Sequence, residues 1–347
     1  MRYKQTTKKS LIFKLLIGLL AVLIVVGALY GIVKLVEDHM KGEEDQIGDS
    51  GDWGTGTEAE EHILDLDGSG YIYTDDLETF LLIGTDDTGK GKDDINDMAD
   101  FLLLMVINRT QNTYGFIQID RDTIAEVPVL DENGEEEGYY DCQICISHAY
   151  GRDDEEADRN TVNAVSKLLG NLEIDGYYAI DMNDIDSLNN AIGGVEVTID
   201  GDLTNVDPEF KDGAKVLLKD DQAEKFVRAR METGKGTNKE RMSRQLQYMQ
   251  SAYNRVINQI RENPDYLNDI YSEVQDKVRT DRNAKELSEF ASYIGQSETK
   301  GFLEFDGESK RGETLEDGIM HSEFYVEQDA ILRTLKELIK LDKEVIE

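Results

Sequence analysis

The residues best suited to chemistry in this sequence are basic side chains gathered in one short stretch, FVRARMETGKGTNKERMSRQ (226–245). They are Arg228, Arg230, Lys235, Lys239, Arg241 and Arg244. The rest of the chain is acidic, and the formal net charge is -36 at pH 7. Planar guanidinium groups bind phosphate oxygens through paired hydrogen bonds, which a lysine ammonium cannot do. The stretch therefore predicts a site for a phosphate-bearing anion. The alternative is a solvated face that pairs with this protein's many acids.

Local pattern predicts how these side chains are held. If RAR is extended, Arg228 and Arg230 project together from one face of the segment. A helix should follow, because MSRQLQYMQSAYNRVINQI carries apolar residues at helical spacing. Arg241, Arg244 and Gln245 stand at i, i+3 and i+4, so they should cluster at the rim of the buried stripe. The start of a helix also favours anions, because its first N–H groups lack partners.

The order of elements predicts an α/β fold with a central mixed sheet sandwiched between helices. Short apolar runs that suit buried strands are TFLLIGTD (79–86), DFLLLMVIN (100–108), YGFIQIDRDT (114–123), IDGYYAIDM (174–182) and VEVTI (195–199). Amphipathic stretches predict helices over 156–170, 183–194, 219–229 and 329–341. We also expect a hairpin around GFLEFDGES (301–309).

The amino-terminal residues predict a membrane anchor. MRYKQTTKKS is basic, and residues 15–33 carry no charge, close to the ~20 residues that span a bilayer. By the positive-inside rule, 1–10 are a cytoplasmic tail, 11–36 a transmembrane helix and the bulk lies outside the cell. A cleaved signal peptide is the alternative, although this apolar run is longer than a usual signal core. Residues 37–60 predict a flexible acidic stalk, and 61–347 an extracytoplasmic domain.

Composition and the remaining motifs bound other functions. The acidic balance argues against a nucleic-acid binder, which needs a broad basic face.

In CQIC, Cys142 and Cys145 have extended-looking flanks that favour structural cysteines, and whether they are bridged is open. His148 is most simply a packed or hydrogen-bonding histidine. GTDDTGKG (84–91) lacks the final hydroxyl residue of a phosphate-binding loop. DLDGSGYIYTDD (65–76) imitates a calcium loop, but two strands joined by a tight turn are the simpler interpretation.

Several motifs in order carry a resemblance to a known family: LLIGTD, DFLLLMVIN, DRDT, HAYG, LLG, IDGYYAIDM, IGGVEV, FVRAR and RMSRQ. Together they resemble the extracytoplasmic domain of the LytR-CpsA-Psr family, over about residues 77–260. The resemblance implies a magnesium-dependent phosphotransferase of cell wall biogenesis. Such an enzyme moves an anionic glycopolymer, teichoic acid or capsular polysaccharide, from a polyprenyl-pyrophosphate carrier to peptidoglycan. It also implies an apolar pocket for the polyprenyl tail.

The resemblance assigns roles to residues of this sequence. Its magnesium ligands would fall on Asp86 and Asp100, which end one apolar strand and begin the next, so that both can meet at one sheet edge. The arginines that grip the pyrophosphate would fall on Arg121, Arg228, Arg230, Arg241 and Arg244, helped by Gln245. Metal and arginines would neutralise charge on the departing polyprenyl phosphate. Asp122 would orient Arg121 or accept the sugar hydroxyl's proton, and we favour orientation.

The chain departs from the family pattern at several positions. Asp120 stands where the family usually has proline, and Asn238 where it usually has aspartate. Met98 and Ala99 replace a usual polar pair. These changes put the placement of Arg121 and the level of activity in question. A non-catalytic module that binds anionic wall polymer or polyprenyl pyrophosphate is therefore the alternative function, and a structural or regulatory membrane protein is a third.

Overall fold

The computed structural model describes residues 62–66, 68–86, 98–131, 133–229, 238–262, 274–282 and 297–343. The predicted anchor (11–36) and stalk (37–60), Arg230 and residues 87–91 of GTDDTGKG lie outside these ranges. In the part of the chain that is described, no helix is long and apolar enough to cross a membrane.

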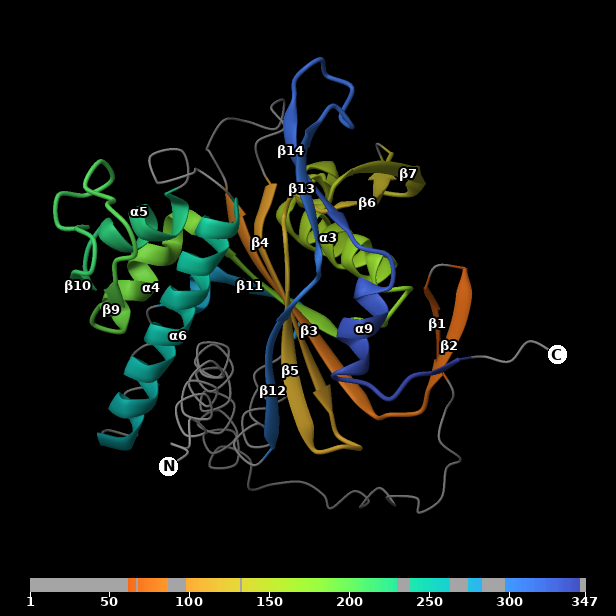
Figure 1. Ribbon diagram of the computed structural model, residues 1–347, viewed down its shortest axis with the longest axis horizontal. Coiled ribbons are helices and arrows are strands. Elements are labelled where there is room, and N and C mark those ends of the chain that lie inside the picture. The colour runs from red at the N-terminus through yellow and green to blue at the C-terminus, as the bar shows by residue number, and fades with distance from the viewer. Residues whose placement is uncertain are drawn as a thin grey trace, which may run out of the picture.

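A six-stranded mixed sheet forms the centre of the molecule, in the order β11-β8-β3-β4-β5-β12 (Figure 1). Its strands are β3 (Leu77–Asp86), β4 (Met98–Asn108), β5 (Thr113–Ile119), β8 (Gly176–Asp181), β11 (Val278–Thr280) and β12 (Glu298–Glu304). β3 is antiparallel to β4 and parallel to β8, and β5 is antiparallel to β4 and parallel to β12. β3, β4 and β5 are buried along most of their length, which explains their continuous apolar sequences. The predicted central mixed sheet is confirmed.

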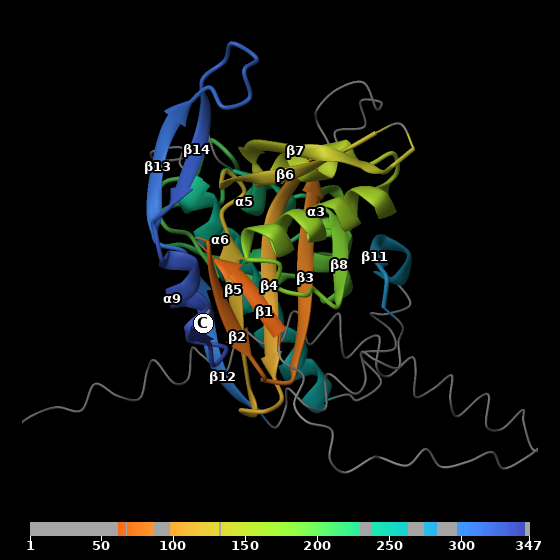
Figure 2. The ribbon, with the colours of Figure 1, turned by 90° about the vertical axis from the view of Figure 1, so that its right-hand side faces the viewer.

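Helices cover both faces of this sheet. α3 (Asp154–Leu168) and α9 (Ala330–Lys336) lie on one side, and α4 (Ile185–Ala191), α5 (Gln222–Arg228) and α6 (Asn238–Glu262) on the other (Figures 1 and 2). Alternate side chains of β3 separate the two cores: Leu81 and Ile83 pack in the core of α3 and α9, while Phe80 and Leu82 pack on the side of α6. The predicted helix at 156–170 is confirmed as α3, which ends before Gly170 in a left-handed conformation (φ 73°).

Smaller elements surround this sandwich. They are β1 (His62–Leu66) with β2 (Ser69–Tyr73) and β15 (Asp342–Lys343), β6 (Ile124–Leu130) with β7 (Glu136–Gln143), β9 (Val195–Thr198) with β10 (Lys215–Leu218), β13 (Gly307–Gly312) with β14 (His321–Val326), and the 3-10 helices η1 (Ile144–Tyr150), η2 (Met182–Asp184) and η3 (Gln275–Lys277). β1 and β2 pair antiparallel, as the two-strand interpretation of DLDGSGYIYTDD predicted.

The predicted hairpin at 301–309 is wrong. β12 pairs in parallel with β5, whereas β13 pairs with β14, so the two halves of GFLEFDGES belong to different sheets. Phe302 of β12 stacks on Phe116 of β5 with ring centroids 4.5 Å apart, and this long-range contact fixes the partner that the local pattern could not specify. Residues after 260 thus complete the same core, since they supply both edge strands and α9.

Candidate active site

Two carboxylates meet at one end of the β3–β4 pair. Asp86 is the last residue of β3 and pairs with Met98, the first residue of β4. The register then shifts: Ala99 opposes Thr85 and Phe101 opposes Gly84, so Asp100 is the extra residue of a β-bulge. A bulge re-aims the side chain it carries. It therefore turns Asp100 out of the regular alternation at the end of the strand where Asp86 lies.

Asp100 binds two arginines that are distant from each other in the sequence. Its Oδ1 accepts from Nη1 of Arg121, at the tip that follows β5, and its Oδ2 accepts from Nη1 of Arg241, in the first turn of α6, at 3.0 Å. All three side chains are at most 14% exposed. Nε of Arg121 also lies 3.4 Å from Oδ1 of buried Asp122, within ion-pair distance, and the orienting role of Asp122 stays a prediction. Pairing of this kind is what allows charged groups to be buried.

Arg228 holds the other carboxylate. Its Nη1 lies 2.5 Å from Oδ1 of Asp86, its Nη2 donates to Oδ1 of Asn183 at 2.9 Å, and its Nε lies 2.9 Å from Glu224. Arg228 is the last residue of α5, which confirms the helix predicted over 219–229, so the alternative of an extended RAR is wrong at its first residue. Helical geometry from Gln222 onward places this guanidinium toward Asp86. Arg121, Arg228 and Arg241 are therefore gathered at one end of the sheet.

Arg244 and Gln245 are placed differently from the expected exposed rim, since both are buried (8% and 4% exposed). Arg244 donates to the backbone carbonyls of Phe226, at 3.2 Å, and of Ala229, which closes the end of α5. These are carbonyls that a helix C-terminus leaves without partners. Its guanidinium thus fastens α5 to α6, and a direct role in substrate binding stays a prediction. Neither amide atom of Gln245 has a hydrogen-bond partner in the described part of the chain.

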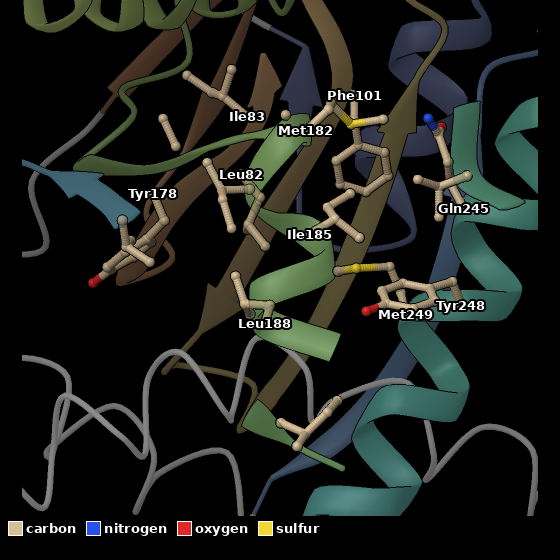
Figure 3. A pocket seen from close by; sticks show the side chains of 16 residues that line it. Leu82, Ile83, Phe101, Tyr178, Met182, Ile185, Leu188, Gln245, Tyr248 and Met249 are labelled. Carbon is tan, nitrogen blue, oxygen red and sulfur yellow. The ribbon is translucent and has the colours of Figure 1, made fainter. Parts of the chain in front are cut away.

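An apolar cavity of about 80 Å³ lies next to this cluster, between the sheet, α4 and α6 (Figure 3). We call it the apolar cavity; its lining includes Leu82, Gly84, Phe101, Tyr178, Met182, Ile185, Leu188, Gln245, Tyr248 and Met249. Gly84 is needed here, because a Cβ at this position would lie 2.9 Å from Cβ of Phe101. Gly84 and Phe101 are close to Asp86 and Asp100 in the strands, so the arginine–carboxylate cluster lies at one end of the cavity.

Several contacts around this cluster had no signal in the sequence. Among the described residues, Nη2 of Arg121 donates to two sulfur atoms, Sδ of Met98 at 2.8 Å and Sγ of Cys145 at 2.9 Å. Cys142 and Cys145 are both buried and free, which answers the open question of a bridge. Burial, with nearby acidic groups, raises the pKa of Cys142 to about 12. Burial also outweighs the opposing effect of Arg121 and raises the pKa of Cys145 to about 11.

Two residues that depart from the family pattern touch each other. Nδ2 of Asn238 donates to Oδ1 of Asp120 at 2.5 Å, and Oδ1 of Asn238 accepts from Nη2 of Arg241 at 2.6 Å. The Asn238 amide therefore links Asp120 to the arginine cluster. Each position could be noticed in the sequence, but nothing in the local pattern showed that they are partners.

An ionic network of His148, Asp158 and Arg279 lies beside the site. His148 was expected to be a hydrogen-bonding histidine and is confirmed as one: its Nε2 lies 3.1 Å from Oδ1 of fully buried Asp158. Asp158 also accepts from Nε of Arg279 at 2.8 Å. The network joins η1, α3 and β11. A charged residue on the inner face of α3 was the signal that could have identified it.

Asp86 and Asp100 fit the expected magnesium chemistry in donor type. Mg²⁺ binds hard oxygens and usually takes one or two carboxylates, with phosphates and water completing its shell. No group of three or more His, Cys, Asp or Glu that could hold a metal occurs among the described residues. Because both carboxylates are held by arginines, substrate phosphates would have to take over those guanidinium groups when a metal binds.

Comparison with known proteins agrees with the fold. The model of the LytR_cpsA_psr family matches residues 50–340. The chain is 29% identical over 172 residues to a Bacillus cereus protein named polyisoprenyl-teichoic acid–peptidoglycan teichoic acid transferase TagU, covering 50% of each chain. It thus spans about half the length of the curated relatives it matches.

Solved structures share the fold at low identity. The protein gbs0355 of Streptococcus agalactiae matches with TM-score 0.60 at 21% identity, over 78% of this chain and 90% of that one. The Bacillus subtilis protein YwtF (TagT) with bound octaprenyl pyrophosphate lipid matches with TM-score 0.51 at 17% identity, over 76% and 89%. The family match covers most of the sequence, including every arginine and carboxylate of the site described above. The chain therefore belongs to the LytR-CpsA-Psr family.

Proposed function

We propose that this protein is a membrane-anchored phosphotransferase that moves an anionic glycopolymer, of the teichoic acid or capsular polysaccharide type, from a polyprenyl-pyrophosphate carrier to peptidoglycan. One observation carries the proposal. Guanidinium groups from the β5 tip, the end of α5 and the start of α6 meet two strand-end carboxylates beside an apolar cavity. A lipid diphosphate has the matching parts, a doubly charged head and an apolar tail.

The arginines are arranged to stabilise a leaving phosphate. In phosphoryl transfer, negative charge spreads over the transferred group and the leaving oxygen, and catalysis rests on positioning and electrostatics. Arg121, Arg228 and Arg241 are each held by a carboxylate before substrate arrives, so the guanidinium groups are already in place when they exchange those carboxylates for substrate phosphates. Asp122 keeps Nε of Arg121 in place. Arg230, which lies beyond the described residues, is proposed for the same site from its sequence position alone.

Asp86 and Asp100 would hold Mg²⁺, the cofactor we propose. When bound, the ion neutralises charge on the phosphates. The arginine side chains of this protein would orient the head group, while Gln245 lines the apolar cavity.

The names of relatives and the sequence of the amino terminus support the rest of the proposal. TagU is named for a polyisoprenyl-linked teichoic acid donor and a peptidoglycan acceptor. The YwtF structure holds a polyprenyl pyrophosphate. The uncharged stretch at 15–33 supports a single-pass anchor in the cell membrane, with residues 1–10 cytoplasmic and 61–347 extracytoplasmic.

Transfer measured with purified full-length protein in detergent tests this function. With a polyprenyl-pyrophosphate saccharide donor, Mg²⁺ and peptidoglycan fragments, we expect saccharide linked through phosphate to the glycan and release of polyprenyl phosphate. EDTA should abolish transfer, and Arg121→Ala or Arg241→Ala should lower kcat/KM about 10²- to 10³-fold, as loss of an oxyanion donor does.

Arg159→Ala is the control, because Arg159 is exposed on α3 and its one ion pair within the described part of the chain is with Glu155 in the preceding turn. It should transfer at the wild-type rate. If the protein retains the lipid but wild type shows no turnover with any divalent cation, the binding-module alternative replaces the enzyme.

A further inference from the structure

A second cavity, of about 170 Å³, lies on the other side of the arginine cluster. We call it the polar cavity. It is bounded by the end of β5, the start of α6, the end of β12 and the β13–β14 hairpin, and its lining includes Gln118, Asp120, Lys239, Met242, Glu304 and Phe324. None of these residues lines the apolar cavity. The polar cavity is therefore a separate space that the lipid tail does not explain.

Gln118 shows that this cavity is built for a polar ligand. The residue is 2% exposed, and among the described residues neither Oε1 nor Nε2 has a hydrogen-bond partner. Its neighbours Phe116 and Tyr114 on the same face of β5 are apolar core residues. A buried amide without partners is costly and is rare outside functional sites. An amide offers both a donor and an acceptor, which is what a hydroxyl or an acetamido group needs.

The charge of the polar cavity selects the kind of ligand. Asp120, Glu304 and Asp306 line it, and Lys239 is the one cation among the described residues of its lining. This balance repels phosphate and the anionic polymer, which the arginines of the neighbouring site attract. The aromatic rings of Phe305 and Phe324 line the same space. Uncharged, hydroxyl-rich surfaces with apolar ring faces, as in saccharides, suit such a lining.

Hydrogen bonds join the polar cavity to the site where the phosphates would bind. Asp120 accepts from Asn238 at 2.5 Å, Asn238 accepts from Arg241 at 2.6 Å, and Arg241 donates to Asp100 at 3.0 Å. Asp120 also directly precedes Arg121 in the chain. A hydroxyl held beside Asp120 would thus face the phosphate held by Arg121 and Arg241.

We propose that the polar cavity binds the acceptor saccharide and that Asp120 is the base that takes the proton from its attacking hydroxyl. The inference rests on the proposed function and adds the acceptor subsite to it. The hydroxyl oxygen bonds to the phosphorus that carries the glycopolymer, and its proton passes to the Asp120 carboxylate. The bond from that phosphorus to the bridging oxygen breaks, and polyprenyl phosphate leaves with the electron pair.

The surroundings of Asp120 suit this role. Burial and the neighbouring Asp122 raise its pKa, while hydrogen bonds from the Asp122 amide and Asn238 and the charge of Arg241 oppose the rise. The other charged groups of the cavity are Lys239 of α6, Glu304 of β12 and Asp306 in the turn that follows. A carboxylate with a raised pKa is a stronger base.

Acceptor kinetics separate this proposal from the proposed function. We would vary peptidoglycan glycan oligomers at saturating polyprenyl-pyrophosphate donor, and measure octaprenyl pyrophosphate binding to each variant in parallel. Gln118→Leu should raise the acceptor KM at least 10-fold with donor affinity unchanged. Asp120→Asn should lower kcat about 10²- to 10⁴-fold, the usual range for loss of a general base, and remove the acidic limb of the pH–rate profile.

Asp141→Asn, an exposed change on β7, should match wild type in every measurement. Retained lipid binding shows that each variant is folded. Unchanged acceptor KM in Gln118→Leu together with unchanged kcat and pH profile in Asp120→Asn would overturn the acceptor subsite while leaving the function intact. Absence of transfer by wild type would instead overturn the function on which the subsite rests.

Discussion

Arg121 donates through Nη2 to the sulfur atoms of Met98 and Cys145, and through Nη1 to Asp100. Sulfur is a weak hydrogen-bond acceptor, whereas a phosphate oxygen is a strong, charged one. Exchange of sulfur for phosphate at Nη2 is therefore favourable, and it can occur while Nη1 still holds Asp100, before a metal would need that carboxylate. At the scale of single residues, this is how a buried arginine is kept in place and still available for substrate.

The two cysteines should be unreactive in the native protein. Their pKa values are raised to about 12 for Cys142 and about 11 for Cys145, so almost no thiolate exists at pH 8. We expect no reaction with Ellman's reagent at pH 8 in native protein and reaction of both thiols after denaturation without reductant. Rapid labelling of native protein, or no free thiol after denaturation, would contradict this.

The Asp120 carboxyl group should lower the free energy of unfolding as the pH rises. Because its pKa is raised in the native state, native protein holds a proton that the unfolded chain has already released. Stability therefore falls as pH rises from the ordinary aspartate pKa toward the raised one, and the loss persists above it. Asp120→Asn keeps the acceptor oxygen for Asn238 and should raise the Tm by a few degrees at pH 7, with little change at pH 4.

Thermal unfolding of Asp120→Asn, wild type and Asp141→Asn across this pH range provides the check. A Tm difference that is the same at pH 4 and pH 7 would show that the charge of Asp120 is not the cause. The opposite effects expected on stability and on kcat are typical of catalytic groups.

At the scale of elements, the start of α6 organises the site through three residues spaced three positions apart. Asn238 holds Asp120, Arg241 holds Asp100 and Arg244 holds the end of α5. These residues stand at i, i+3 and i+6, so one helical face serves two strands and a second helix. On the sheet, the β-bulge at Asp100 turns that carboxylate toward the arginines. The site thus depends on the angle between α6 and the β3–β4 end.

Arg244→Met should destabilise this arrangement by about 2–4 kcal/mol, because it keeps much of the apolar volume but leaves the carbonyls of Phe226 and Ala229 without their charged donor. Urea unfolding would measure the loss. Arg159→Met, which removes an exposed ion pair within α3, should cost less than about 1 kcal/mol. Equal stability of the two variants would mean that Arg244 does not fasten α5 to α6.

At the scale of the whole molecule, the sequence predicted the central sheet, most helices and the residues of the arginine cluster. Strong apolar runs and helical periodicity are local signals, and the family resemblance supplied the roles. Prediction from sequence failed where contacts between distant residues determine the structure. The stacking of Phe302 on Phe116 sets the partner of β12, and the carbonyl groups at the end of α5 account for the burial of Arg244. Charged residues are placed on surfaces by default, so no local rule predicts a buried guanidinium. The polar cavity joins four elements and had no sequence signal.

The affinity of full-length protein in detergent for octaprenyl pyrophosphate tests the central claim most directly. We predict much tighter binding than for octaprenol or inorganic pyrophosphate alone. In a double-mutant cycle, Arg121→Ala and Arg241→Ala should show a coupling energy above about 0.5 kcal/mol, because both groups share Asp100 and one diphosphate. Equal affinity for the alcohol and the pyrophosphate, with fully additive arginine variants, would contradict a single diphosphate site at the end of the apolar cavity.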